Sequence, residues 1–362
     1  MGSIAVIGAG NVGLAISGHM SIEGHDVRLY DPWGDDFQLI EENGGIGLVG
    51  DVEGIGSPRV LSTSLHEVVA GAEVIIVAAP AFSHDDIARR LAVLGEPEQV
   101  VLFQPGAFGS GVQLLRQFTA NGRSPSFVAE TLTSLYTCRK QSAVSVYIGA
   151  IKNSVGLSAV PSRHTPHCVE VLNSYFGERY VGGSDALTTG LNNSNPVYHV
   201  PPSVLNFKTV EDGCEYPLHT LVTPRVAEIV NLMDEERLKV AGALDVDCMS
   251  FWEFLSSAYG VRDGDYHERI VQAYGRQAFP EPSSPRHRYF IEDIPFGMVP
   301  WLSLAWELGV SVPVTQSLTV LGSALCAQDF MSNGRTLESL GLENAGKGGI
   351  RSAFIDGEVS RF

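Results

Sequence analysis

The chain has 362 residues, a length typical of about two domains rather than of one hydrophobic core. Its 41 Asp and Glu outnumber its 24 Lys and Arg, and the formal net charge of -17 argues against nucleic acid or an anionic membrane as the main partner. The five cysteines are scattered without a C-x-x-C pair, so neither a disulfide framework nor a metal site is indicated, and no uninterrupted apolar run reaches membrane-spanning length.

The start of the chain predicts a βαβ unit with a glycine-rich turn. An apolar strand at 4–7 leads into a turn that reads Gly-Ala-Gly-Asn-Val-Gly at 8–13, a helical segment follows at 14–22, and a second short strand ends at Asp31. A G-x-G-x-x-G pattern between a strand and a helix is the dinucleotide-binding fingerprint. The residues of the turn that we expect to bind the cofactor are Gly8, Gly10, Asn11, Val12 and Gly13.

Each glycine of this turn has a physical role. Gly8 permits the tight turn, Gly10 lets the backbone approach a pyrophosphate, and Gly13 lets the helix pack closely on the strand. We expect the pyrophosphate to bind the amide groups at the positive end of the helix that begins near Asn11.

Asp31 predicts which dinucleotide binds. A carboxylate at the end of the second strand accepts hydrogen bonds from the ribose 2′-hydroxyl of NAD, but it repels the 2′-phosphate of NADP. The interval from Leu29 to Pro58 contains no Lys, Arg or His that could pair with such a phosphate. The sequence therefore predicts NAD and indicates that no cation is available at this position.

The segments that follow alternate between strands and helices. Near-continuous apolar runs such as 73–80 are typical of parallel strands that are covered on both faces. The alternation indicates a doubly wound parallel sheet, the Rossmann α/β fold. We predict its remaining strands at 59–61, 73–80, 100–106, 127–130, 144–148 and 180–181, with helices at 65–70 and 85–94 between them.

Three strand ends supply further cofactor-binding candidates. Doubly wound sheets bind their ligands beyond the carboxyl ends of the strands. We therefore expect these segments on the ribose and nicotinamide side of the cofactor: Ala79 with Pro80, Pro105 with Gly106, and the loop 132–140.

From about Ala186 the pattern becomes mainly helical. Thr223 and Pro224 suit the N-cap and first position of a long helix, because the threonine side chain accepts from the first turn and proline lacks an N–H that would be unpaired there. Its apolar residues recur at helical spacing to Leu244, and this face suits either the core or a homodimer interface. We predict a Rossmann domain at 1–186 and a helical substrate domain at 187–362. The other predicted helices include 251–258, 269–273, 317–328 and 336–340.

A bound nicotinamide exchanges a hydride, so the chain must also supply a group that moves a proton, and histidine is the usual choice. His199 lies just after the domain junction, in a segment at 192–202 that is dense in polar side chains. Farther on, Arg288 and Asp293 flank an apolar pair. A buried carboxylate orients a catalytic histidine, and an arginine holds a substrate carboxylate with two hydrogen bonds. From the residues alone the other histidines compete with His199, and His84 is the next candidate.

Taken together, these segments resemble the opine dehydrogenases, especially the bacterial enzymes that act on N-(1-D-carboxyethyl)-L-norvaline and, more distantly, octopine dehydrogenase. The similarity covers nearly the whole chain, and its most specific part is Asn195-x-x-x-His199 combined with Arg288-x-x-x-x-Asp293. The other shared pieces are 8–13, Pro105-Gly106-Ala107, Glu130-Thr131, Thr137-Cys138-Arg139, Thr223-Pro224, 334–342 and 349–353.

The resemblance implies roles for four residues. His199 matches the proton-transfer histidine and Asp293 its carboxylate partner, while Arg288 matches a substrate-binding arginine and Asn195 a polar substrate contact. The family also pairs a Rossmann domain with a helical C-terminal domain, in agreement with the division above.

Two further residues join the cofactor-binding candidates through the shared pieces, namely Glu130 and Cys138. The chain departs from the family pattern at Pro196, which follows the asparagine, and at Tyr198, which precedes the histidine. Both reshape the pocket, so the identity of the substrate is not carried over with the mechanism.

The resemblance implies an NADH-dependent enzyme that condenses a 2-oxo acid with the amino group of an amino acid and reduces the resulting imine. We expect these small molecules as its partners, and the absence of a leader pattern favours a cytoplasmic protein. One alternative is a ketone or 2-oxo-acid reductase of the glycerol-3-phosphate or ketopantoate reductase kind, in which Lys152 of the Lys152-Asn153 pair is the acid. The other is a non-catalytic NAD-binding sensor, because a fold does not imply an activity.

Overall fold

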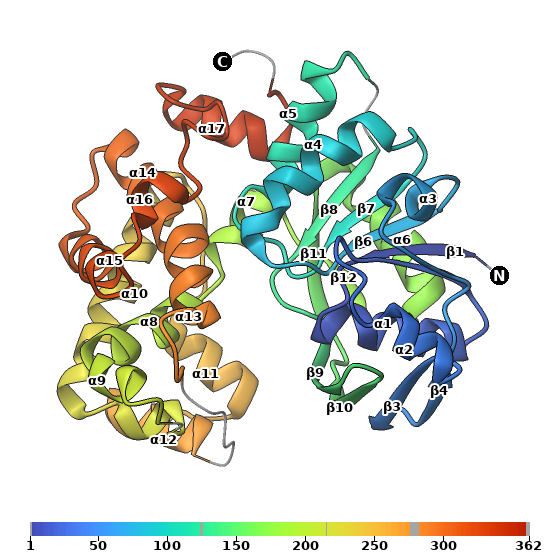
Figure 1. Cartoon of the computed structure of the whole chain (residues 1–362). Helices are drawn as coiled ribbons and strands as arrows, with labels where there is room; N and C mark the ends of the chain where they lie inside the picture. The colour runs from blue at the N-terminus through green and yellow to red at the C-terminus, as the bar shows by residue number, and fades with distance from the viewer. Residues whose placement is uncertain (1, 124–125, 215, 276–281, 360–362) are drawn as a thin grey trace. The chain divides into compact units, whose positions relative to one another are not determined.

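The computed structural model describes residues 2–123, 126–214, 216–275 and 282–359 (Figure 1). Contacts within the chain divide it into two compact units, which are described separately. The first comprises the chain up to Gly190 together with the C-terminal segment from Ser352, and the second runs from Leu191 to Arg351. The boundary predicted between 186 and 187 falls at the start of helix α7 (Ala186–Leu191), and the prediction assigns the C-terminal segment to the second domain.

The first unit is built on an eight-stranded sheet of order β12-β11-β8-β7-β6-β1-β2-β5. Its neighbouring strands are parallel except for β11 and β8, which are antiparallel. The residues of the central strands β6 and β7 are all buried, as expected for parallel strands covered on both faces. This sheet confirms the predicted Rossmann α/β fold. Its strands are β1 (Ser3–Ile7), β2 (Asp26–Tyr30), β5 (Val60–Ser62), β6 (Val74–Val77), β7 (Val100–Phe103), β8 (Phe127–Thr131), β11 (Val155–Val160) and β12 (Tyr180–Gly182).

The register of the central strands sets the position of the glycine-rich turn. Ile7 at the end of β1 is paired with Tyr30 of β2 on one side and with Val77 of β6 on the other. Val77 is in turn paired with Phe103 of β7. These strands therefore end together, and the segments that follow them emerge at the same edge of the sheet.

Helices of the first unit pack on this sheet. Leu14, Ile16 and Met20 of α1 are buried in the same hydrophobic core as the apolar residues of β1 and β6. The helices predicted at 65–70 and 85–94 are confirmed as α3 and α4. The helices of this unit before α7 are α1 (Asn11–Ile22), α2 (Phe37–Glu42), α3 (Leu65–Val69), α4 (His84–Leu94), α5 (Ser110–Ala120) and α6 (Thr165–Phe176), with short turns η1 (Ala81–Ser83) and η2 (Ser162–His164).

A second sheet of order β4-β3-β10-β9 corrects one prediction. The strand predicted at 144–148 is β10 (Ser145–Ile151), and its assignment to the main sheet is wrong. β10 pairs instead with β9 (Tyr136–Ser142) in an antiparallel hairpin, because two antiparallel strands need only a short connection. Buried Val146 and Ile148 alternate with an exposed tyrosine between them, as in a strand covered on one face. The remaining strands, β3 (Ile46–Gly50) and β4 (Gly54–Gly56), lie in a glycine-rich interval for which the sequence predicts no strand.

The second unit is helical, as predicted, and α10 (Pro224–Ala243) is its longest helix. The hydroxyl of Thr223 accepts a hydrogen bond from the backbone N–H of Val226 at 3.3 Å, so the predicted cap is present. Val230, Met233 and Val240 are buried, so the apolar face of α10 packs in the core of the unit rather than forming a free surface. No helix in the described parts of the chain is both long and apolar enough to cross a membrane. The other helices are α8 (Asn195–Leu205), α9 (Phe207–Glu211), η3 (Leu218–Leu221), α11 (Phe251–Tyr259), α12 (Tyr266–Tyr274), α13 (Arg288–Ile291), the π-helix η4 (Ile294–Met298), α14 (Val299–Leu308), α15 (Pro313–Leu325) and α16 (Phe330–Asn333). Helix α17 (Gly346–Ile355) begins in this unit and ends in the C-terminal segment that belongs to the first.

The short helix predicted at 336–340 is wrong, because this segment forms successive turns. The backbone N–H of Thr336 donates to the hydroxyl of Ser339 at 3.0 Å, and the N–H of Ser339 donates to the hydroxyl of Thr336 at 3.1 Å. Such short polar side chains compete with helical hydrogen bonds for the backbone. Gly341 follows with a φ of +69°, which ends the segment in the left-handed region.

Candidate functional site

The glycine-rich turn has the geometry of a dinucleotide site. Gly8 adopts a φ of +109°, and a Cβ on Gly13 would lie 1.8 Å from the carbonyl oxygen of Gly8, so both positions require glycine. Gly10 is the N-cap of α1, and a Cβ there would meet no heavy atom within 4 Å of the described chain. The space beside Gly10 is therefore open. No side chain caps this helix end and its first turn has no acidic residue, so its amide groups are available to an anion.

A cavity of about 340 Å³ adjoins this turn. It is lined by Gly8 and Gly10 and by Asp31, Ala79 and Pro80, so the structure brings these predicted residues together. The Asp31 carboxylate accepts hydrogen bonds from the backbone N–H groups of Ala9 at 3.2 Å, Trp33 at 3.1 Å and Gly34 at 3.3 Å. These contacts hold the carboxylate at the wall of the cavity. The residues therefore fit a bound dinucleotide.

A cation also lines this cavity, which corrects the expectation that none is available. Arg90 of α4 donates to the hydroxyl of Tyr30 at 2.6 Å and lies 3.9 Å from the carboxylate of Asp86. Arg90 and Asp86 both line the cavity with Asp31. The sequence interval around Asp31 contains no cation, and the fold supplies one from a helix far along the chain.

Other cofactor-binding candidates lie elsewhere in the first unit. Gly106 packs against Glu130, because a Cβ on the glycine would lie 2.6 Å from the Cβ of the glutamate. Glu130 is buried, and its carboxylate accepts from the backbone N–H of Gly111 at 3.1 Å in the first turn of α5. Pro105, Gly106 and Glu130 do not line the 340 Å³ cavity. Their predicted cofactor contacts stay predictions.

Asn11 connects the turn with the small sheet. The side-chain oxygen of Asn11 accepts from the backbone N–H of Lys140 at 2.8 Å, and Val12 packs against the core. Cys138 lies on β9, and burial raises the pKa of its thiol to about 12, so it stays protonated.

The alternative candidates have structural partners. His84 is buried, with Nδ1 at 2.9 Å from the hydroxyl of Ser110 and Nε2 at 2.9 Å from the carbonyl oxygen of Ala79. Both ring nitrogens are therefore engaged within the fold. The ammonium of Lys152 donates to the hydroxyl of Thr133 at 2.7 Å, and burial lowers the pKa of this lysine.

In the second unit the structure brings His199 and Asp293 together. Nδ1 of His199, on α8, lies 2.8 Å from Oδ2 of Asp293, and their side chains are only 12% and 9% exposed. Burial lowers the pKa of His199, the Asp293 carboxylate raises it, and Arg288 lowers it, with a net shift below the usual value. A hydrogen bond from Nδ1–H to the carboxylate leaves Nε2 as the nitrogen that accepts and donates a proton.

The residues around this pair come from two short elements. Arg288 and Tyr289 belong to α13, and Asp293 directly precedes the π-helix η4, a rare helix type that is frequent at functional sites. His287 caps α13, because its Nδ1 accepts from the backbone N–H of Tyr289 at 3.4 Å. The guanidinium of Arg288 lies 5.8 Å from the centroid of the Tyr289 ring.

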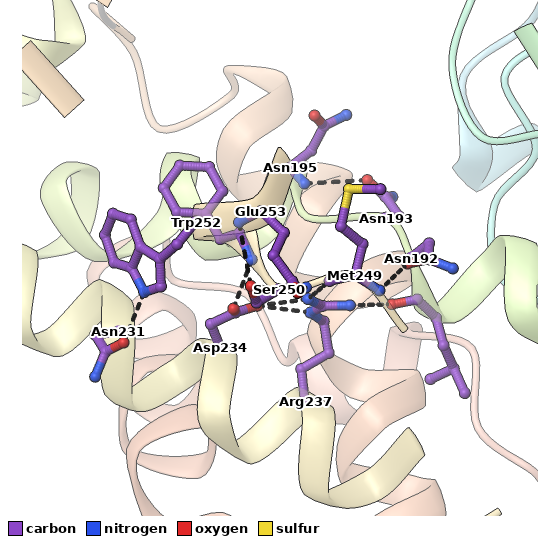
Figure 2. Close-up of polar contacts among 12 residues, drawn as sticks. Asn192, Asn193, Asn195, Asn231, Asp234, Arg237, Met249, Ser250, Trp252 and Glu253 are labelled. Atoms are coloured by element: carbon purple, nitrogen blue, oxygen red, sulfur yellow. Dashed lines mark hydrogen bonds and ion pairs between the residues drawn. The ribbon is translucent and has the colours of Figure 1, made fainter. Parts of the chain in front are cut away.

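Asn195 begins α8 and is exposed. Its backbone N–H donates to the side chain of Asn193 at 3.1 Å, and Figure 2 shows its amide group directed away from the neighbouring polar network. In that network Arg237 donates to Asp234 at 2.6 Å and to the carbonyl oxygen of Leu191 at 2.6 Å. The residues just before α8 are thereby attached to α10.

This buried network was not predicted. Arg237 is 1% exposed, and it also donates to the carbonyl oxygen of Met249 at 2.7 Å, whose own N–H donates to Asn192 at 2.8 Å (Figure 2). The sequence does contain a signal for it. Arg237 follows Met233 by four positions and precedes Val240 by three, so it lies on the apolar stripe of α10. No sequence pattern of this kind indicates His287 or Tyr289, which pack near His199.

No group of His, Cys, Asp and Glu able to hold a metal ion occurs among the residues that the structure describes. The chemistry that the two sites support is therefore binding of a dinucleotide by the first unit and proton transfer by a carboxylate-paired histidine in the second.

Comparisons with known proteins match a family to each of the two units. Residues 182–326 match the family described as NAD/NADP octopine/nopaline dehydrogenase, alpha-helical domain, and residues 4–131 match the family described as ketopantoate reductase PanE/ApbA. An opine dehydrogenase of Arthrobacter sp. (strain 1C) is 30% identical over 351 residues, which are 96% of this chain and 98% of that protein.

The fold is similar to that of octopine dehydrogenase solved with NADH and L-arginine, with a TM-score of 0.80 at 17% identity over 97% of this chain and 98% of that one. A structure of octopine dehydrogenase with NADH and pyruvate has a TM-score of 0.75 at 17% identity over 94% and 96%.

Proposed function

The chain belongs to the opine dehydrogenase family, and on that premise we propose that it catalyses the NADH-dependent reductive condensation of a 2-oxo acid with the amino group of an amino acid. The observation that supports this most is the hydrogen bond of 2.8 Å between His199 and Asp293, in a chain that also has the dinucleotide turn. The product of such a reaction is a secondary amine that carries two carboxylates.

The first unit holds the cofactor in this proposal. The amide groups that follow Gly10 bind the pyrophosphate, and the Asp31 carboxylate accepts from the ribose hydroxyls of NADH. When bound, the cofactor supplies the hydride that reduces the imine carbon.

In this proposal the second unit supplies the residues that transfer the proton and bind a substrate carboxylate. The amine and the 2-oxo acid lose one water to form the imine, and the reduction then consumes one hydride and one proton. His199 moves this proton through Nε2, and Asp293 stabilises the imidazolium through Nδ1. Arg288 binds a substrate carboxylate, because a guanidinium offers two parallel N–H donors. Asn195 at the exposed start of α8 supplies a further polar contact to the substrate.

The molecules bound in solved structures of similar fold support this substrate class. Octopine dehydrogenase was solved with L-arginine and with pyruvate, an amino acid and a 2-oxo acid. Such a pair needs a group that binds a carboxylate and a group that transfers the proton, and in this proposal Arg288 and His199 have these roles.

A substrate screen tests the proposal. NADH oxidation is measured with pyruvate, glyoxylate and 2-oxoglutarate, each alone and each with a panel of amino acids. We expect NADH to be consumed only when a 2-oxo acid and an amino acid are both present, and the product to have the mass of the secondary amine. Consumption with a 2-oxo acid alone would identify the reductase alternative. Tight NADH binding without turnover for any pair would identify the sensor.

A further inference from the structure

The ring of Tyr289 lies flat against the imidazole of His199. The two ring centroids are 3.9 Å apart and the ring planes differ by 17°. Tyr289 is buried and belongs to α13, whereas His199 belongs to α8. Asp293 contacts the edge of the imidazole at Nδ1, so the tyrosine and the carboxylate hold different parts of the same ring.

In the described part of the chain, the other aromatic side chain next to His199 does not stack on its imidazole. Tyr198 precedes the histidine in the chain, but its ring is 5.8 Å from the imidazole and tilted by 49°. It stacks instead on Tyr274 at 4.2 Å and 6°. The rings of His287 and Tyr289 are nearly perpendicular, with an angle of 81° between their planes and 4.4 Å between their centroids. The ring of Tyr289 thus contacts His287 and presents a face to His199.

The charged and titratable groups near His199 have opposite effects on its proton. Asp293 favours the imidazolium, whereas Arg288 and burial disfavour it, and His287 lies close enough to interact with it. An aromatic face carries partial negative charge and attracts a cation placed over it. Tyr289 therefore adds to the effect of Asp293 rather than to that of Arg288.

We propose that Tyr289 is a positioning residue for proton transfer, whose ring fixes the plane of the His199 imidazole and stabilises its protonated form. The role in catalysis rests on the proposed function. The effect on the proton affinity of His199 does not, because it depends only on the stack.

The direction in which the pKa of His199 changes distinguishes this role from simple packing. Tyr289→Leu removes the aromatic face and leaves apolar cover, so the imidazolium loses stabilisation and the pKa of His199 falls. If the tyrosine acted only by excluding water, its replacement by a smaller side chain would admit water and raise that pKa. Tyr289→Phe keeps the face and removes only the hydroxyl, so it leaves the pKa of His199 close to that of the unaltered chain.

The direct test is a titration of His199 by NMR in the full-length protein. The ring C–H signal is assigned by its disappearance in His199→Asn and followed with pH in each variant. We expect Tyr289→Leu to lower the pKa of His199 by about half a unit or more, and Tyr289→Phe to change it by less than about 0.2. Tyr274→Leu is the matched control, because Tyr274 stacks on Tyr198 and not on His199, and it should leave this pKa unchanged.

Two results would overturn the proposal. One is an unchanged or raised pKa of His199 in Tyr289→Leu. The other is an equal fall in Tyr289→Phe, which would assign the effect to the hydroxyl. Tyr289→Met gives the same comparison if the leucine variant does not fold, because methionine also lacks an aromatic face.

The activity readout separates this inference from the proposed function. In the oxidative direction neutral His199 accepts the proton, so the acid limb of kcat/KM should move to lower pH in Tyr289→Leu and stay in place in Tyr289→Phe. A role limited to packing would lower kcat and would leave the limb in place or move it to higher pH. If no substrate pair is turned over, the proposed function fails, and the NMR titration still decides whether Tyr289 acts on His199.

Discussion

His199 is subject to opposing influences that set its proton affinity. Burial and Arg288 lower its pKa and Asp293 raises it, and the net direction is below the usual value of about 6.5. The ring is therefore mainly neutral near pH 7 and can accept a proton at Nε2. The 2.8 Å contact at Nδ1 fixes the tautomer that makes this possible.

Replacement of Asp293 tests this balance at the residue scale. Asp293→Asn removes the negative charge that raises the pKa of His199, so this pKa should fall further. We expect the acid limb of the oxidative pH profile to move to lower pH and kcat to fall by about tenfold or more, because the imidazolium loses its partner. Glu292→Gln is the control, since it removes an equal charge from the preceding residue. A limb that moves to higher pH would contradict the assigned pairing.

The sequence indicates His199 and Asp293 but not the side chains that surround them. His199 and Asp293 belong to segments with a family pattern, whereas the stack of Tyr289 on His199 depends on how α13 packs against α8. Residues from two elements meet only in the folded chain, and no spacing within either element reveals the contact.

At the scale of elements, buried polar groups hold the second unit together around the start of α8. Arg237 and Asp234 on α10 form a buried ion pair, and both also bond to backbone groups of neighbouring segments. Glu236 of the same helix accepts from the N–H groups of Val314 and Thr315 and thereby caps α15. Helix α10 therefore holds several neighbouring segments of the second unit in place.

Removal of Arg237 should destabilise this unit strongly. Arg237→Met leaves Asp234 buried without its charged partner, and a change of this kind costs about 3–5 kcal/mol. Urea unfolding followed by tryptophan fluorescence measures it, and Asp234→Asn combined with Arg237→Met should cost less than the sum of the two single changes. Lys208→Met is the matched control, because it breaks an exposed ion pair with Asp212 and should leave the unfolding midpoint unchanged. Equal effects of Arg237→Met and Lys208→Met would refute the structural role of the buried pair.

The cap of α13 predicts a pH dependence of stability. Burial, Arg288 and His199 lower the pKa of His287 to about 4, and its neutral Nδ1 accepts from the N–H of Tyr289. In the unfolded chain this histidine takes up a proton near pH 6.5. As the pH falls from 6.5 toward 4, the unfolded state gains a proton that the folded state does not, so stability is lost in this window.

His287→Asn tests this cap, because asparagine also accepts at an N-cap and does not titrate. We expect the loss of Tm between pH 7 and pH 5 to be smaller in His287→Asn than in the unaltered protein. His66→Asn, at an exposed histidine of α3, should keep the original dependence. Identical losses of Tm in His287→Asn and the unaltered protein would show that His287 does not titrate in this way.

Local patterns account for the elements that were predicted correctly. The glycine turn and the helix that starts at Pro224 are specified within a few residues by turn and cap preferences. The segment 336–340 was misread because Thr336 and Ser339 bond to the backbone of one another, which periodicity does not register. β10 was predicted as a strand and assigned to the wrong sheet, since strand propensity does not specify the partner.

At the scale of the whole molecule, the chain carries more acidic than basic side chains, and one of its arginines lines the cavity beside the glycine turn. The cavity beside the glycine turn contains Arg90 together with Asp31 and Asp86, so its cation is balanced by two carboxylates. Arg90 is contributed by a helix that begins long after Asp31, so the sequence near Asp31 does not reveal it. We therefore expect the selection of NAD to depend on Asp31 rather than on the lack of a cation.

Cofactor preference should change when Asp31 is neutralised. Asp31→Asn keeps one oxygen that can accept from the N–H groups of Trp33 and Gly34, and it gives up the second oxygen, which accepts from Ala9. The change also removes the charge that repels a 2′-phosphate, while Arg90 remains in the cavity. We expect the ratio of the NADPH Kd to the NADH Kd to fall by about tenfold, equivalent to roughly 1.4 kcal/mol. Fluorescence titration measures both constants. Asp35→Asn removes an equal charge from an exposed residue outside the lining, and a similar fall in that variant would contradict a specific role of Asp31.

The central claim is that His199 moves the proton in a two-substrate reductive condensation. Its most direct test is the rate of NADH oxidation by His199→Ala with a 2-oxo acid and an amino acid both saturating, measured together with the Kd for NADH. We expect a loss of kcat of about 10²-fold or more with NADH affinity unchanged, because in the proposed function the residues of the first unit bind the dinucleotide. Turnover by His199→Ala at a rate close to that of the unaltered enzyme would contradict it.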